Sequence, residues 1–322
     1  MIITNNHGVS LTLAIWLIND DYDYNGAEQY ISVTALMRPL RQIILPRRLD
    51  QSKREADVID YVARAMGNSL HDSIEKAWTK NYFTNLIKLG YSEDMIERVL
   101  INPTSEELIA KQDPIPIYIE QRATRKFKNW TIGGKFDIVA EGILQDNKST
   151  SAWTWVYGGR DNEHQLQGSL YRWLNPDKIT EDFVRINYIF TDWSKANLGN
   201  PKYPRQRVES KDILLLDITE SESWILNKLS LIEKYMEAPE KEIPECTSEE
   251  LWMSDPAYKY YADPTKVNGR STKNFDSLSE AQIFIQSKGG KGIIKTIPGE
   301  PKRCGYCDAF DACSQKDKYF HD

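Results

Sequence analysis

Hydrophobic and polar positions follow two different periods along the chain, and each change of period marks an expected element. Between residues 54 and 89 apolar residues recur at helical spacing, which predicts one or two helices around Gly67. The next segment changes to strand character in three pieces, "PIYIEQRATRKF", "WTIGGKFDIVA" and "ILQDNKST". Further elements are expected as a helix over 162–174, strands over 183–192 and 205–217, and an amphipathic helix over 220–236.

Shorter patterns complete this outline. Thr219 followed by Glu222 predicts a capping box at the start of the helix over 220–236. Helices are also expected over 92–100 and Leu278–Ser287, and the apolar run Val9–Ile18 reads as a strand. The order of elements predicts an α/β (α+β) fold, in which helices flank a central mixed β-sheet.

Three regions are expected along the chain. Residues 1–53 would hold an N-terminal strand and a basic segment, residues 54–240 the core, and residues 241–322 a small appendage clamped by cysteines. The apolar run Val9–Ile18 is too short to span a bilayer and lacks a cleavage site, so no membrane association and a cytoplasmic location are expected.

The composition narrows the choice of ligand. Lys and Arg total 41 against 47 Asp and Glu, a net charge of −6. A protein that binds polyanions without regard to sequence is usually basic overall. Any nucleic-acid site is therefore expected to be a local basic patch.

Two aspartates are predicted to face each other on a hairpin. If Glu141-Gly142 is a two-residue loop, counting back along both strands places Asp137 opposite Asp146. Like charges there are destabilising, and a divalent cation such as Mg²⁺ would relieve them. Lys148 lies two residues after Asp146 and shares its face. An Asp-x-Lys sequence is more often a solvated strand face, so the motif needs support from elsewhere.

That support comes from two helices. His71 lies at the edge of the apolar stripe of the first helix, where a histidine is more often a packing residue than a ligand. Gln167 and Tyr171 are four residues apart and share a helical face with His164.

Together these residues resemble the PD-(D/E)XK nucleases of the RecB-like branch, which include helicase-attached domains and stand-alone phage proteins. The family order is a helix with G-x-x-x-H, a strand with G-x-x-D, a strand with D-x-K, and a helix with Q-x-x-x-Y. Here the four motifs are Gly67 to His71, Gly134 to Asp137, Asp146 to Lys148, and Gln167 to Tyr171.

The resemblance implies a restriction-endonuclease-like core and a role for each matched residue. His71, Asp137 and Asp146 would bind Mg²⁺ or Mn²⁺, with the carbonyl of Asn147 as a further ligand. Lys148 would be the catalytic lysine, and Gln167 and Tyr171 would orient the substrate and support the catalytic site. Glu120 resembles an acidic position of less uniform role that many members carry, and it is a further candidate metal ligand. DNA contacts are expected from Arg38, Arg41, Arg122, Arg125, Lys126 and Lys128, with base stacking by Trp130 and Trp153.

All four cysteines lie near the C-terminus, at Cys246, Cys304, Cys307 and Cys313. In a reducing compartment clustered thiols are more often metal ligands than disulfides. Four thiolates suit either a [4Fe–4S] cluster or a structural zinc ion, and free thiols are the alternative. The arrangement resembles the iron-sulfur staple of several RecB-like nucleases, although the distant cysteine there usually precedes the core.

The expected function is metal-dependent hydrolysis of DNA, most simply as an exonuclease on single strands or ends in phage or bacterial replication, recombination or repair. Two alternatives remain open, a structure-specific endonuclease and a non-catalytic recombination scaffold. The chain has no Walker A loop, so unwinding would need a helicase or recombination protein as partner.

Overall fold

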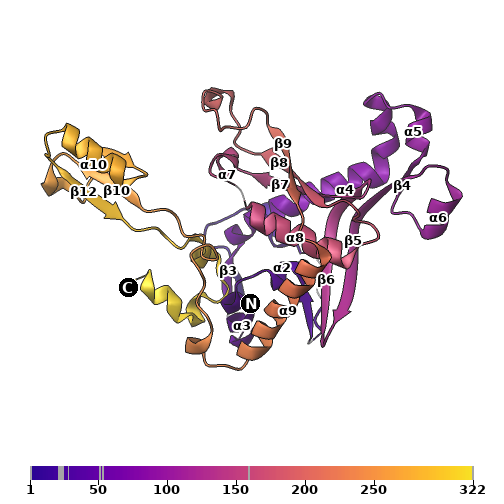
Figure 1. Cartoon of the computed structure of the whole chain (residues 1–322), viewed down its shortest axis with the longest axis horizontal. Coiled ribbons are helices and arrows are strands. Elements are labelled where there is room, and N and C mark those ends of the chain that lie inside the picture. The colour runs from indigo at the N-terminus through magenta and orange to yellow at the C-terminus, as the bar shows by residue number, and fades with distance from the viewer. Residues whose placement is uncertain are drawn as a thin grey trace. The chain divides into compact units, whose positions relative to one another are not determined.

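The computed structural model describes residues 2–20, 25–27, 29–50, 52, 54–158 and 160–320. Two compact units can be distinguished (Figure 1). The first contains residues 1–38 and 50–230, and the second contains residues 39–49 and 231–322. The segment Pro39–Leu49 therefore belongs with the C-terminal part of the chain, although the sequence places it beside the N-terminal strand.

The first unit is built on a seven-stranded mixed sheet, in the order β4-β5-β6-β7-β8-β9 with β2 also paired to β6. β5 with β6, β6 with β7 and β8 with β9 are antiparallel, whereas β4 with β5, β7 with β8 and β2 with β6 are parallel. The strands are β2 (Tyr30–Ser32), β4 (Val99–Ile101), β5 (Ile115–Phe127), β6 (Trp130–Ala140), β7 (Ile143–Thr150), β8 (Phe183–Phe190) and β9 (Val208–Leu214).

Helices cover both faces of this sheet. Ile138 packs with Ile74 and Trp78 of α4 (Val62–Lys88). Its neighbour Val139 belongs to a second cluster that includes Tyr171 of α8 (Asp161–Leu174). Because successive strand residues point to opposite faces, α4 and α8 lie on opposite sides of the sheet. The predicted α/β (α+β) architecture, a central mixed sheet flanked by helices, is confirmed.

The described chain contains further, mostly shorter elements. The remaining helices are α1 (Leu11–Ile18), α2 (Val33–Leu36), α3 (Leu40–Ile44), α5 (Glu93–Glu97), α6 (Ser105–Ala110), α7 (Ala152–Val156), α9 (Ile218–Tyr235) and α10 (Leu278–Ser287). β1 (Ile2–Thr4) and β3 (Glu55–Asp57) form a separate parallel pair. Among the described residues, no helix combines the length and the apolar character that crossing a membrane requires.

Three details of the predicted outline are wrong. Val9–Ile18 is not a strand, because Leu11–Ile18 forms α1; a short, uniformly apolar run has no period that separates the two structures. The expected helix over 92–100 ends at Glu97, and Val99–Ile101 instead pairs with β5.

The third detail is the cap of α9. The capping box uses Asp217 and Glu220, since the backbone N–H of Glu220 donates to Asp217 Oδ1 at 2.7 Å and that of Asp217 donates to Glu220 Oε2 at 3.0 Å. Thr219 donates its hydroxyl to the same aspartate, so a cap two residues upstream occupies the role that the sequence assigned to Thr219.

The second unit contains a small sheet that the sequence did not predict. β10 (Ala257–Tyr261) is central, between β11 (Lys273–Phe275) and β12 (Ile293–Ile297), and both pairs are antiparallel. α10 contacts all three strands, and Figure 1 shows it lying across them. The predicted helix Leu278–Ser287 is confirmed, and we call residues 257–297 the β10–β12 lobe.

Candidate metal centre

The hairpin between β6 and β7 turns as predicted, at Glu141-Gly142. Both residues have positive φ, 52° and 79°, as a two-residue type I′ turn requires. Ala140 is paired with Ile143, and the recorded pairs extend to Ile138 opposite Gln145. The next position in this register is Asp137 opposite Asp146, so the turn brings the two aspartates to neighbouring strands at the same level.

The two carboxyl groups interact and titrate in opposite directions. Burial raises the pKa of Asp137 to about 6, His71 lowers it, and the charge of Asp146 raises it again. Burial acts on Asp146 in the same sense, but the charge of Lys148 and hydrogen bonds from Asp137 and Lys148 hold the pKa of Asp146 below its ordinary value. A single proton shared by the pair would therefore reside on Asp137.

Asp137 also belongs to a tight group of metal-ligand atoms. His71, Glu120 and Asp137 each offer one atom, and these three atoms lie within 4.8 Å of one another. His71 Nδ1 is 3.2 Å from Asp137 Oδ2 and 4.0 Å from Glu120 Oε1. The nearby Asp137 carboxylate is the main cause that raises the pKa of His71.

One atom of this group, Asp137 Oδ2, is well suited to bind a cation. Asp137 Oδ2 is buried and has no well-oriented hydrogen bond among the described residues, although His71 Nδ1 is near. A buried carboxylate oxygen without a partner is costly, and a bound cation would satisfy it. Two carboxylates and an imidazole form a ligand set that a divalent ion such as Mn²⁺ or Mg²⁺ accepts.

Glu120 enters this group through an unusual backbone. Its φ is 51°, although it lies in the middle of β5. The recorded pairing of β5 with β6 passes from Ile119–Ile138 to Gln121–Phe136 and omits the Glu120–Asp137 position. A non-glycine residue with positive φ inside a strand is strained, and such strain concentrates at functional sites. The other oxygen of Glu120 forms an ion pair with Lys135.

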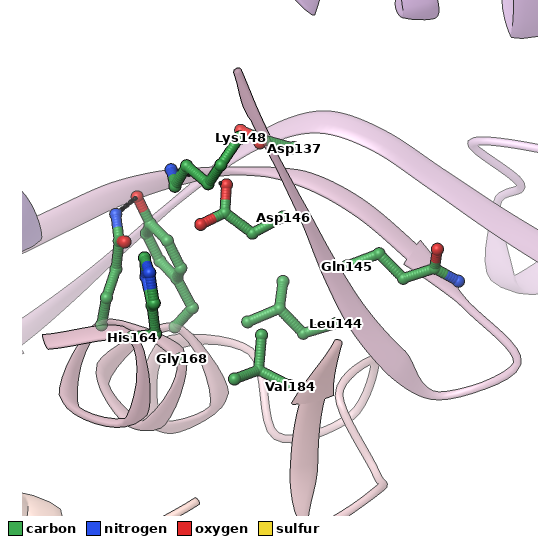
Figure 2. Close-up of a pocket in the computed structure, with 10 residues that line it drawn as sticks. Asp137, Leu144, Gln145, Asp146, Lys148, His164, Gly168 and Val184 are labelled. Carbon is green, nitrogen blue, oxygen red and sulfur yellow. Dashed lines mark hydrogen bonds and ion pairs between the residues drawn. The ribbon is translucent and has the colours of Figure 1, made fainter. Parts of the chain in front are cut away.

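Lys148 lies beside Asp146 on β7. Its Nζ is 2.8 Å from Asp146 Oδ1. Figure 2 shows Lys148, Asp146 and Asp137 converging on one side of the strand while Gln145 points to the other side. Strand alternation accounts for this arrangement.

These residues line a pocket, and α8 closes one side of it. Its lining includes Asp137, Asp146, Lys148, His164, Gln167 and Tyr171. Gln167 Nε2 and Tyr171 Oη are 3.5 Å apart, which is a weak contact. A Cβ at Gly134 would lie 2.7 Å from Tyr171 Cε1, so the glycine of the G-x-x-D motif allows α8 to approach the sheet.

His164 was noted in the sequence as sharing this face of α8 but was given no role. Figure 2 shows its ring directed toward Asp146 and Lys148. Burial lowers the pKa of His164, which favours the neutral imidazole. The signal in the sequence was its position three residues before Gln167.

Asn147 lies on the opposite face of β7, toward α4. Its side chain lines a second small pocket with His71, Glu120 and Asp137, and its Oδ1 accepts a hydrogen bond from Asn187 Nδ2 at 3.1 Å. The backbone of Asn147 is paired with Asn187 in the parallel β7–β8 ladder. The roles predicted for Asn147 and for the other site residues stay predictions.

The residues expected to contact DNA have different environments. Arg38, Arg122, Arg125, Lys126 and Lys128 are exposed. Arg125 is nevertheless engaged, because it donates to the carbonyl of Trp173, pairs with Glu222 at 3.3 Å and stacks on the Trp173 ring. Trp130 is 6% exposed and is therefore a core residue, contrary to the predicted base stacking, whereas Trp153 is 39% exposed.

Arg41 requires a correction. It is 3% exposed, so its predicted contact with a surface phosphate is replaced by contacts inside the second unit. The guanidinium forms an ion pair with Glu240 and donates to the carbonyl of Ile243 at 3.0 Å and to Cys313 Sγ at 3.4 Å. Because Arg41 alternates with apolar residues in the sequence, it was interpreted as a surface residue. Its partners in the structure lie about two hundred positions away in the sequence, so local spacing does not indicate its burial.

The four cysteines line one pocket, together with Arg41. Burial raises the pKa of the Cys246 thiol to about 12, and it also raises the pKa of the Cys304 thiol. Gln315 links the segments that carry Cys246 and Cys313, because its side chain accepts from the backbone N–H of Cys246 and donates to its carbonyl. The cysteines are thus brought together by the fold.

Comparisons with known proteins show only distant similarity. No protein-family model matches the chain, and no curated protein matches it in sequence. The crystal structure of SSO0001 is similar over 65% of this chain and 79% of its own length, with 15% identity and a TM-score of 0.40. A phage related exonuclease from Haemophilus somnus 129PT is similar over 36% of this chain and 57% of its own length, with 16% identity and a TM-score of 0.24. Likeness at this level assigns no activity to this chain.

Proposed function

We propose that this protein is a Mg²⁺- or Mn²⁺-dependent deoxyribonuclease that acts as an exonuclease on single-stranded DNA or DNA ends. The observation that supports the proposal most directly is the group of His71, Glu120 and Asp137 beside the Asp146–Lys148 pair. Four separate segments of the first unit supply these residues, and a solvated strand face would not need them to converge.

In this proposal His71, Glu120 and Asp137 would hold a divalent cation, and the bound ion would supply positive charge next to the scissile phosphate and activate water. Glu120, a candidate ligand of less uniform role in the family, would bind the ion together with His71 and Asp137. Asp146 interacts with Asp137, and its lowered pKa favours the ionised carboxylate that would complete the ligand set.

Lys148 would place a second positive charge at the reacting phosphate. The ion pair with Asp146 holds its ammonium at the pocket, where it offsets the charge that develops on the phosphate oxygens. The neutral imidazole of His164 can accept a proton in the same pocket. Gln167 and Tyr171 would position the substrate strand against this group.

The active-site assignment is tested with Asp146→Ala. We expect loss of cleavage with DNA binding largely retained, because the substitution removes a ligand but no phosphate contact. Asp212→Ala is the matched control, since Asp212 is an exposed strand acid paired with Arg185 at 2.7 Å, far along the sequence from the motifs. Wild-type digestion by Asp146→Ala would refute the assignment.

The exonuclease assignment is tested by comparing digestion of linear and circular DNA. End-labelled linear DNA and closed circles are compared with Mg²⁺ and with Mn²⁺. Cutting of closed circles would instead establish an endonuclease, and absence of cutting by wild type with either ion would favour the non-catalytic scaffold.

We also propose that Cys246, Cys304, Cys307 and Cys313 hold a [4Fe–4S] cluster, with structural zinc as the alternative. A zinc ion with Zn–S bonds of about 2.3 Å requires its sulfurs within roughly 4 Å of one another. The four cysteines line one pocket in the part of the chain that the structure describes, which fits a four-thiolate centre of either kind. The guanidinium of Arg41 donates to Cys313 Sγ and would stabilise the thiolate.

Metal analysis and the visible spectrum test this centre. A brown protein that absorbs near 400 nm would contain iron and sulfide, whereas one zinc ion per colourless chain would establish the alternative. Cys304→Ser and Arg41→Gln should both lower the metal content. Arg48→Gln is the control for Arg41, because Arg48 also donates to backbone carbonyls, at Tyr235 and Met236, but has no recorded contact with a sulfur.

A further inference from the structure

The β10–β12 lobe differs in charge from the rest of the chain. It contains seven Lys or Arg residues and three Asp or Glu, a net charge of +4 within a chain of net charge −6. One of its three acids, Asp263, is already hydrogen-bonded to Thr265 and paired with Lys266 at 3.6 Å. The lobe is therefore a local basic surface on an acidic protein.

The two faces of its sheet are different. Tyr258, Tyr260, Phe275 and Ile294 pack with Phe284 and Ala281 of α10. Residues at alternate positions point to the other face, and they include Lys259, Asn274 and Lys295. Asn274 and Lys295 are exposed and Lys259 is half-buried. This side of the sheet, which α10 does not cover, is called the open face.

Lys259 and Lys295 are directly paired across β10 and β12, and Lys259 also faces Asn274 on β11. Directly opposed like charges, with Cβ atoms about 5 Å apart, destabilise a sheet. Neither lysine has an ion-pair partner among residues 54–158 and 160–320 or the other described parts of the chain. A small sheet therefore carries an unfavourable pair that an anionic ligand would relieve.

Protection of a sheet edge can explain Lys295 but not Lys259. Lysine on an edge strand guards against pairing with other chains, which accounts for Lys295 on β12. β10 is the central strand, so Lys259 has no such role. Other basic residues of the lobe are occupied on the helix side, where Lys273 and Lys288 stack on the Phe284 ring.

We infer that the open face binds the phosphate backbone of DNA, through Lys259 and Lys295. The inference rests on the proposed function for the identity of the polyanion. Two adjacent ammonium groups with a neighbouring amide suit successive phosphates better than a single carboxylate. Of the residues predicted to bind DNA elsewhere, Arg41 is buried and Arg125 is engaged with Glu222, so the open face would add phosphate contacts to those of the exposed Lys126 and Lys128.

The test measures the affinity of the full chain for a short labelled single strand by fluorescence anisotropy, without added metal, over a range of salt concentrations. Lys259→Ala with Lys295→Ala should weaken binding roughly tenfold. The slope of log K against log salt should fall by about 0.7 for each lysine removed. Lys259→Arg with Lys295→Arg should bind as wild type, which excludes misfolding of the lobe as the cause.

Lys273→Ala with Lys288→Ala is the matched control, because it removes the same charge from the helix side of the same lobe. An unchanged slope in the Lys259 and Lys295 variant, or an equal loss in the control, would overturn the inference. Cleavage is assayed on the same samples. A wild type that binds through these lysines but does not cleave would refute the proposed nuclease and leave the DNA-binding face intact.

Discussion

At the scale of single residues, Asp137 connects the parts of the candidate site. Its pKa depends on Asp146, it lies 3.2 Å from His71, and it offers a ligand atom beside that of Glu120. Its Oδ2 atom is buried without a well-oriented partner. The residue is thus poorly accommodated without a cation, and its protonation should control both metal binding and stability.

Asp137→Asn should stabilise the metal-free protein at pH 7 by about 1–3 kcal/mol. The folded pKa of about 6 is above the unfolded value, so above pH 6 the fold contains an ionised buried carboxylate at a cost. As pH falls from 6 toward 4 the folded state takes up a proton, wild-type stability rises, and the difference between variant and wild type shrinks.

Urea unfolding in EDTA between pH 4 and 8 measures this effect. Asp212→Asn is the control with the opposite sign, because hydrogen bonds from Arg185 lower the pKa of Asp212. With Mn²⁺ present the ranking should reverse for Asp137, since the ion binds the ionised carboxylate. Equal stability of Asp137→Asn and wild type at every pH in EDTA would contradict the proposed cost of burial.

At the scale of elements, the β6–β7 hairpin places Asp137 and Asp146 side by side, and α4 and α8 add groups from either face. The glycines of the two G-containing motifs have different environments. Gly134 is in close contact with α8, whereas a Cβ at Gly67 would have no neighbour within 4 Å. Packing therefore explains the first glycine but not the second.

Gly67→Ala should raise the free energy of unfolding by up to about 1 kcal/mol, because glycine is unfavourable inside a helix. Gly134→Ala should lower it by roughly 1–3 kcal/mol through overlap with Tyr171. Thermal unfolding of both variants checks the two signs. If Gly67→Ala gains stability but loses nuclease activity, substrate approaches α4 at that residue; a loss of stability would contradict the expectation.

At the scale of the whole molecule, the two compact units have separate cores. The sheet of the first unit is packed around Phe136, Val139 and Leu144 and around Ile117 and Ile138, whereas the β10–β12 lobe has its own cluster around Tyr260 and Phe275. The cysteines and Arg41 belong to the second unit, and the candidate metal centre belongs to the first. Loss of either proposed metal should therefore leave the other unit folded.

Cys304→Ser should remove protection from hydrogen exchange in residues 39–49 and 231–322, while β5–β8 keep theirs. Mass spectrometry of exchanged peptides measures both units in one experiment. Asp137→Ala is the reciprocal control, with changes expected near α4 and β6 but not near the cysteines. Equal loss of protection in both units would show that they unfold together.

The sequence alone determined the features that depend on neighbouring residues: the strand and helix periods, the Glu141-Gly142 turn, the order of the four motifs and the helix Leu278–Ser287. It misread α1, because a continuous apolar run carries no period. Tertiary structure decided which distant side chains meet. The proximity of Glu120 to His71 depends on a strained backbone in β5, and the burial of Arg41 depends on partners near residue 240. Neither feature can be inferred from the spacing of neighbouring residues. The contrast follows from physics, since turns and periods are set by local backbone geometry, whereas a site is set by which faces pack together.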